Sequence, residues 1–275
     1  MLDPFQLQFM QRAALEIVLL APLAGILGAQ IVLRGLAFYT HGVGAATFPG
    51  LVVAGPLGIA PPIAALGVGL GFAAGLERLS RVVRLAEDVV TALLLVAALA
   101  IGIVLASDVF EAGAEVDQLL FGSLIAIGDA ELAATAVALA VAAAATLACR
   151  RTWIATGFDP ATSASLGLRS RLCDWVLVAA IAVAVVAALD AVGALLVSAI
   201  LVIPAATARL VAASIVALEA GAAALALALG LAGLWVAYQL DTPPGPTIAT
   251  LGGIAFALTL AGRAAVPAIV RGRAR

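Results

Sequence analysis

Residues 191–209 form an almost unbroken apolar segment, AVGALLVSAILVIPAATAR, which contains Pro204 and ends on an arginine. About 20 apolar residues cross the roughly 30 Å hydrocarbon core of a bilayer, so the length of this segment predicts a membrane span. A proline inside a helix leaves one backbone carbonyl without its donor, and lipid has no group that can replace that donor. We therefore expect a kinked span whose proline faces protein or a cavity.

The whole chain has the composition of a polytopic membrane protein. Of its 275 residues, 65% are hydrophobic and 11% are charged, and the mean hydropathy is +1.22, whereas a soluble domain is nearer half apolar. We expect an all-α membrane protein with eight or nine transmembrane helices in a single domain over residues 1–275. The number of transmembrane helices is eight if the short second and third spans form a re-entrant or tightly bent hairpin. The expected spans are residues 13–33, 42–57, 61–76, 89–106, 132–149, 175–189, 192–208, 217–238 and 247–262.

The placement of arginine predicts the orientation of these spans. Arginines gather in the loops at residues 78–84 and 150–171 and in the tail after residue 262, and such loops are normally cytoplasmic. The acidic loop at residues 108–117 and the turn at residues 241–246 contain no arginine, so we expect them outside. Nine spans then place the carboxyl terminus in the cytoplasm.

The charge balance and the lysine count limit the partners and the energy source. A formal net charge of −2 gives no indication of a nucleic-acid partner. The chain has no lysine, so it lacks the residue that clamps phosphate in a Walker A loop. If transport here consumes ATP, another polypeptide must bind the nucleotide.

A cytoplasmic segment of a different kind, residues 152–173, lies between the fifth and sixth spans. Asp159 suits a helix cap, Pro160 suits the first helical position, and Gly167 suits a left-handed stop. Together with Leu166 and the small residues between them, they predict a short helix parallel to the membrane. This helix is either a docking element for a cytoplasmic partner or a plain structured loop.

Four motifs occur in an ordered series along most of the chain. They are RGLAFY at residues 34–39, FDP and LG at residues 158–167, VGALLV leading into IPAATAR at residues 192–209, and DTPPGPT at residues 241–247. In this order they resemble the membrane permeases of bacterial zinc and manganese ABC importers, the ABC-3 family.

The resemblance implies an ABC importer permease fold that forms a homodimer in the bacterial inner membrane. It implies two copies of an ATP-binding cassette subunit and an extracytoplasmic metal-binding protein as partners. This chain would then be a transporter subunit rather than an enzyme, with a transported metal ion and no permanently bound cofactor. Asp159, Pro160, Leu166 and Gly167 would belong to the coupling helix, and the outer turn with Asp241, Pro243 and Gly245 would lie where the binding protein delivers its cargo.

The chain departs from the family at the position of the usual metal ligands. Permeases of this type have an aspartate and, four residues later, a histidine at the start of the second span, whereas this chain has His41 and Ala45. His41 is the single histidine, and its nitrogen ligand favours zinc over manganese or iron. A lone ligand binds weakly, but two copies of His41 could converge at a dimer axis. The alternative is an interfacial histidine, solvated or hydrogen-bonded beside Thr40.

Two further features allow more than one interpretation. Gly67, Gly71 and Gly75 form a smooth stripe, which we expect to serve packing within the chain, with a conduit or subunit interface as the alternative. Glu16 could offer oxygen to a passing cation, although an ion pair with Arg12 or an extended position reaching the membrane surface would explain it equally.

Two other classes of function remain open. A secondary transporter driven by an ion gradient would need inverted repeats and carboxylates in mid-membrane. A scaffold or sensor subunit would need no conduit.

Overall fold

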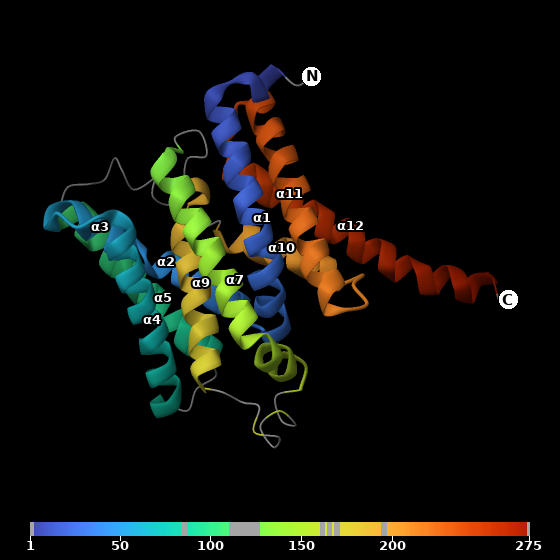
Figure 1. The fold of residues 1–275 in the computed structure, drawn as a ribbon, viewed down its shortest axis with the longest axis horizontal. Helices are drawn as coiled ribbons and strands as arrows, with labels where there is room; N and C mark the ends of the chain where they lie inside the picture. The colour runs from blue at the N-terminus through green and yellow to red at the C-terminus, as the bar shows by residue number, and fades with distance from the viewer. Residues whose placement is uncertain are drawn as a thin grey trace.

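The computed structural model describes residues 3–83, 87–109, 127–159, 163, 167, 171–193 and 197–273. Within these ranges the chain is helical and has no strand, which confirms the all-α prediction. The helices form a bundle from which α12 projects at one side (Figure 1). In chain order the elements are η1 (Asp3–Gln6), α1 (Gln8–Arg34), α2 (Ala37–Ala46), α3 (Phe48–Leu57), α4 (Pro61–Val83), α5 (Glu87–Val104), η2 (Leu105–Val109), α7 (Asp129–Phe158), α9 (Arg171–Val192), α10 (Val197–Arg209), α11 (Ile215–Leu240) and α12 (Pro244–Arg273).

Seven of the helices in the described ranges are long and apolar enough to cross a membrane: α1, α4, α5, α7, α9, α11 and α12. Each of them overlaps one of the expected spans. The other two expected spans, at residues 42–57 and 192–208, have a different form.

The expected span at residues 42–57 is divided at Thr47 into α2 and α3, each of ten residues. Pro49 explains the break, because it has no N–H to donate to the carbonyl of Ala45, one turn earlier. The Thr47 hydroxyl instead donates to the Gly44 carbonyl over 2.6 Å. Two short helices therefore replace one continuous span. Helix α3 packs closely on α4, with the Cβ position of Gly50 only 2.8 Å from the Ala64 carbonyl oxygen, as in the hairpin that was the alternative.

The kinked span is shorter than its apolar run. The preceding helix, α9, continues to Val192, and Gly193 then adopts a left-handed backbone with φ of 87°. Helix α10 contributes 13 residues, from Val197 to Arg209. Hydrophobicity predicted an apolar helix in this segment but not the positive-φ residue that precedes it.

Helix α1 lies at the centre of the bundle, packed against α7, α10 and α11 (Figure 1). Its glycines permit this contact. A Cβ atom at Gly28 would lie 2.3 Å from the Leu201 carbonyl oxygen, and one at Gly25 would lie 2.7 Å from the Glu219 carbonyl oxygen. The backbones of α1 and its neighbours are therefore closer than any side chain would allow, as in many membrane helix pairs.

The glycine stripe on α4 has no packing partner among the described residues, so they do not support the expected packing within the chain. A Cβ atom at Gly67, Gly71 or Gly75 would meet no atom of the described residues within 4 Å. Gly69, on another face of the same helix, would instead meet Thr47 at 3.4 Å. In the part of the chain that the structure describes, the stripe is an uncovered, smooth surface.

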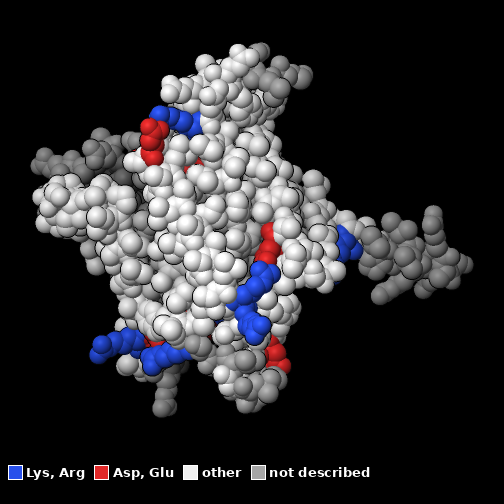
Figure 2. Space-filling view, viewed as in Figure 1, with Lys and Arg blue, Asp and Glu red and all other residues white. Residues whose placement is uncertain are grey.

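Charged side chains are sparse on the surface of the bundle. Figure 2 shows one face as largely uncharged, with a few small clusters, several of which join both signs. Such a surface is compatible with lipid, because isolated charges in hydrocarbon are costly whereas paired charges near helix ends are tolerated.

Candidate functional site

His41 lies half-buried on α2 and faces α10. Its Nδ1 atom is 3.2 Å from the Ser198 hydroxyl, and the tautomer decides which of the two groups donates. The neighbouring Tyr39 hydroxyl donates to the Val178 carbonyl of α9 over 3.2 Å. Helix α2 is thus held against two helices, and the imidazole has a fixed orientation.

Among the described residues, no second metal ligand is seen beside His41. Ala45, one turn further along α2, is fully buried and has no ligand atom on its side chain. Across the residues that the structure describes, no group of three or more His, Cys, Asp and Glu side chains is placed to hold a metal ion. The described part of one chain therefore supplies a single ligand at this position, His41.

Glu16 lies inside the protein, not at the membrane surface. Its carboxylate is fully buried and accepts a hydrogen bond of 2.6 Å from the Thr135 hydroxyl of α7. Arg12, one turn earlier, forms an ion pair of 2.9 Å with Asp129 at the start of α7. The expected extension of Glu16 to the membrane surface is wrong, because the Thr135 hydroxyl holds the carboxylate between helices.

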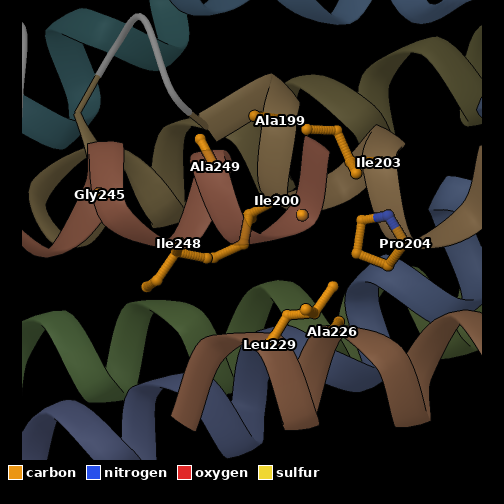
Figure 3. A pocket seen from close by; sticks show the side chains of 10 residues that line it. Ala199, Ile200, Ile203, Pro204, Ala226, Leu229, Gly245, Ile248 and Ala249 are labelled. Carbon is orange, nitrogen blue, oxygen red and sulfur yellow. The ribbon is translucent and has the colours of Figure 1, made fainter. Parts of the chain in front are cut away.

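Pro204 is buried and contributes to a small apolar pocket between α10, α11 and α12. Figure 3 shows its ring beside Ile203, with Leu229 and Ala226 of α11 facing it. The pocket has no polar side chain, so it offers no side-chain ligand to a metal. It is lined by Ala199, Ile200, Ile203, Pro204, Ala226, Leu229, Gly245, Ile248, Ala249 and Gly252.

The segment between α7 and α9 is described at three of its residues. Asp159 ends α7, and its carbonyl accepts a hydrogen bond of 3.1 Å from the amide of Ser163, as at the start of a helical turn. Gly167 has φ of 69°, the left-handed conformation that its position predicted. Pro160 and Leu166 lie outside the described residues.

A cluster of polar contacts joins the helix ends on both sides of this segment. The buried Trp153 of α7 donates from Nε1 to the Cys173 carbonyl of α9 over 2.8 Å. Arg34, the last residue of α1, donates from Nη1 to the Asp174 carboxylate over 2.9 Å and from Nη2 to the Thr156 hydroxyl. No motif in the sequence predicts this cluster, whose only signals there are a tryptophan and two charges near expected helix ends.

Two more ion pairs connect the same helices to the rest of the bundle. Arg150 of α7 is 3.1 Å from Glu219 of α11, and Arg171 of α9 is 3.3 Å from Glu77 of α4. Each helix that flanks the segment is thus joined to a neighbouring helix by an ion pair, α7 to α11 and α9 to α4.

The turn after α11 is shorter than expected. Asp241 has a positive φ of 51° and caps α11, and α12 begins at Pro244. Gly245 and Pro246 therefore belong to the first helical turn, where proline is favoured because the first amides of a helix have no acceptor. Asp241 and Pro243 remain exposed at the tip.

The acidic loop expected at residues 108–117 falls almost entirely outside the described residues. Its part in any docking surface stays a prediction.

Comparison with known proteins gives concordant similarities. The manganese transport system membrane protein MntC of Halalkalibacterium halodurans is 30% identical over 251 residues, which cover 91% of this chain and 86% of that protein. The chelated iron transport system membrane protein YfeD of Yersinia pestis is 28% identical over 94% of this chain and 86% of its own. The structure of PsaBC from Streptococcus pneumoniae in complex with Fab superposes with a TM-score of 0.84 at 24% identity, covering 94% of this chain and 93% of that chain, and so shares its fold.

The family comparison covers nearly the whole chain. The model of the ABC 3 transport family matches residues 6–271, from η1 into the last turns of α12. A match of this length includes every span described above. This chain therefore belongs to the ABC 3 transport family.

Proposed function

We propose that this chain is the transmembrane permease of an ATP-driven importer for a divalent transition metal. The observation that carries the proposal is the family match over residues 6–271. Relatives named for manganese and chelated iron transport align over most of their own lengths, so the similarity extends beyond one motif. The metal is the transported substrate and not a resident cofactor.

The partners follow from what the chain lacks. With no lysine it has no Walker A loop of its own, so a separate ATP-binding cassette subunit must supply hydrolysis. We propose two copies of that subunit, a second copy of this permease, and an extracytoplasmic metal-binding protein, assembled in the bacterial inner membrane. The open stripe of Gly67, Gly71 and Gly75 favours a second copy, because small residues let helices approach closely.

Each end of the permease has its own proposed role. The segment with Asp159, Pro160, Leu166 and Gly167 receives the motion of the cassette subunits on the cytoplasmic side, which also holds the carboxyl terminus. The turn with Asp241, Pro243 and Gly245 faces the binding protein on the outside.

The transport path is proposed to pass His41. Ser198 engages Nδ1, which leaves Nε2 as the nitrogen for a passing ion, the usual arrangement of a metal-binding imidazole with an oriented second nitrogen. Two copies of His41, one from each permease, would form a weak site suited to rapid passage. The nitrogen ligand favours zinc, whereas the names of the relatives favour manganese or iron.

Competition between metals tests this proposal. Proteoliposomes that contain the permease, its cassette subunit and its binding protein should accumulate radioactive zinc when ATP is supplied. Excess unlabelled zinc, manganese or iron(II) then ranks the three metals by how far each suppresses that uptake. Strongest suppression by zinc would support the ligand argument, and strongest suppression by manganese or iron(II) would support the relatives. Failure of radioactive zinc, manganese and iron(II), each supplied alone, to accumulate would contradict the proposed function.

His41→Ala is expected to lower ATP-driven metal uptake about tenfold, which corresponds to roughly 1.4 kcal/mol of lost metal interaction. Initial rates of uptake at limiting metal provide the measurement. Thr40→Val is the matched control, because the Thr40 hydroxyl bonds only to the Leu36 carbonyl of its own helix among the interactions seen and should affect uptake less than twofold. Equal uptake by wild type and His41→Ala would show that the transport path does not pass His41.

A further inference from the structure

Arg34 occupies a position from which it contacts both ends of the proposed coupling segment. Its side chain is 13% exposed, and its guanidinium lies between the last turns of α7 and the first turn of α9. Nη1 binds Asp174 of α9, while Nη2 binds the Thr156 hydroxyl and, at 3.4 Å, the Trp153 carbonyl of α7. One rigid fork thus holds two helices that follow each other in the chain and are connected by that segment.

The two flanks are also fixed to each other. The bond from Trp153 Nε1 to the Cys173 carbonyl joins α7 to α9 directly, one residue before Asp174. Because Trp153 is fully buried, the indole cannot change its position without disturbing the packing around it. A displacement of the segment should therefore move the end of α7 and the start of α9 as one unit.

Arg34 also stands at the entrance to the helix that carries His41. It is the last residue of α1, and Gly35 follows with φ of 71° before α2 begins at Ala37. A force on the Arg34 guanidinium would reach α2 through only two backbone residues, Gly35 and Leu36. The Arg150–Glu219 and Arg171–Glu77 pairs each reach one flank alone, whereas Arg34 contacts both flanks and is separated from α2 by only two residues of the chain.

We propose that Arg34 is a positioning residue that couples displacement of the segment at residues 159–167 to α2, and hence to His41. This inference rests on the proposed function, because it presumes that a cassette subunit acts on the segment. Asp174 and Thr156 are its two side-chain partners. If the contact transmits motion, its loss should separate ATP hydrolysis from transport and not lower both together.

The test measures the number of metal ions imported per ATP hydrolysed by the complete complex in proteoliposomes. Asp174→Asn keeps the size of the side chain and removes the charge, and we expect it to lower this ratio about tenfold while ATP hydrolysis stays within about twofold of wild type. Thr156→Val is nearly isosteric and should lower the ratio about threefold. It also keeps the proposal testable if Asp174→Asn fails to fold.

Asp129→Asn is the matched control, since the Arg12–Asp129 pair has the same separation of 2.9 Å and joins α1 to α7 at the opposite end of α1. The ratio should change less than twofold in this variant. A proportional fall of uptake and hydrolysis in Asp174→Asn and Thr156→Val, with the ratio unchanged, would overturn the proposal and leave Arg34 a structural role. Absence of ATP-driven uptake in the wild-type complex would instead overturn the proposed function and this inference with it.

Discussion

Replacing Gly28 by leucine should leave almost no folded permease in the membrane. The Cβ position at Gly28 lies 2.3 Å from the Leu201 carbonyl oxygen and 3.0 Å from the Ala205 Cβ, so any side chain would force α1 away from α10. Overpacking in a close-packed interior costs about 1–3 kcal/mol when side chains can yield, and a backbone contact yields less. We expect the free energy of unfolding to fall by more than about 3 kcal/mol. The yield of monodisperse protein and its thermal unfolding midpoint in detergent are the measurements.

Gly253→Leu is the matched control for this substitution. Gly253 lies in α12, and a Cβ there would meet no atom of the described residues within 4 Å. This variant should be purified in normal yield with an unchanged midpoint. Normal yield of Gly28→Leu as well would show that α1 and α10 are farther apart than described.

Replacing Gly167 by valine should abolish most transport while the permease remains folded. Gly167 has φ of 69°, a conformation that costs a β-branched residue about 1–3 kcal/mol, so the end of the proposed coupling segment would adopt another shape. We expect ATP-driven uptake to fall at least about tenfold and less cassette subunit to copurify with the permease.

Gly58→Val separates this effect from general strain. Gly58 has nearly the same φ, 65°, and ends α3 away from the coupling segment. The variant should retain uptake within about twofold of wild type. Equal losses in Gly167→Val and Gly58→Val would mean that backbone strain, and not coupling, explains the result.

Most of the fold was predictable from sequence because hydrophobic length dominates the folding of a membrane chain. Helices α1 and α11 follow their expected spans closely, α7 extends nine residues beyond its expected end at residue 149, and Gly167 has the left-handed backbone that its type favours. The errors come from local backbone chemistry. Pro49 divides one span, and the positive φ of Gly193 shortens another, although hydrophobicity is continuous across both.

The site was less predictable because its contacts join residues far apart in sequence. Arg34 and Asp174 are separated by 140 positions, and His41 and Ser198 by 157, so no local pattern could pair them. The glycine stripe at Gly67, Gly71 and Gly75 shows the same limit, because its spacing predicts a smooth face but not which surface covers it.

The most direct test of an ATP-driven metal importer compares two energy sources in the same proteoliposomes. One sample receives ATP on the cassette side with no ion gradient, and the other receives an imposed proton or sodium gradient with the cassette subunit omitted. We expect accumulation of radioactive metal in the first sample and none above background in the second. Accumulation in the second sample would contradict the account and identify the chain as a secondary transporter.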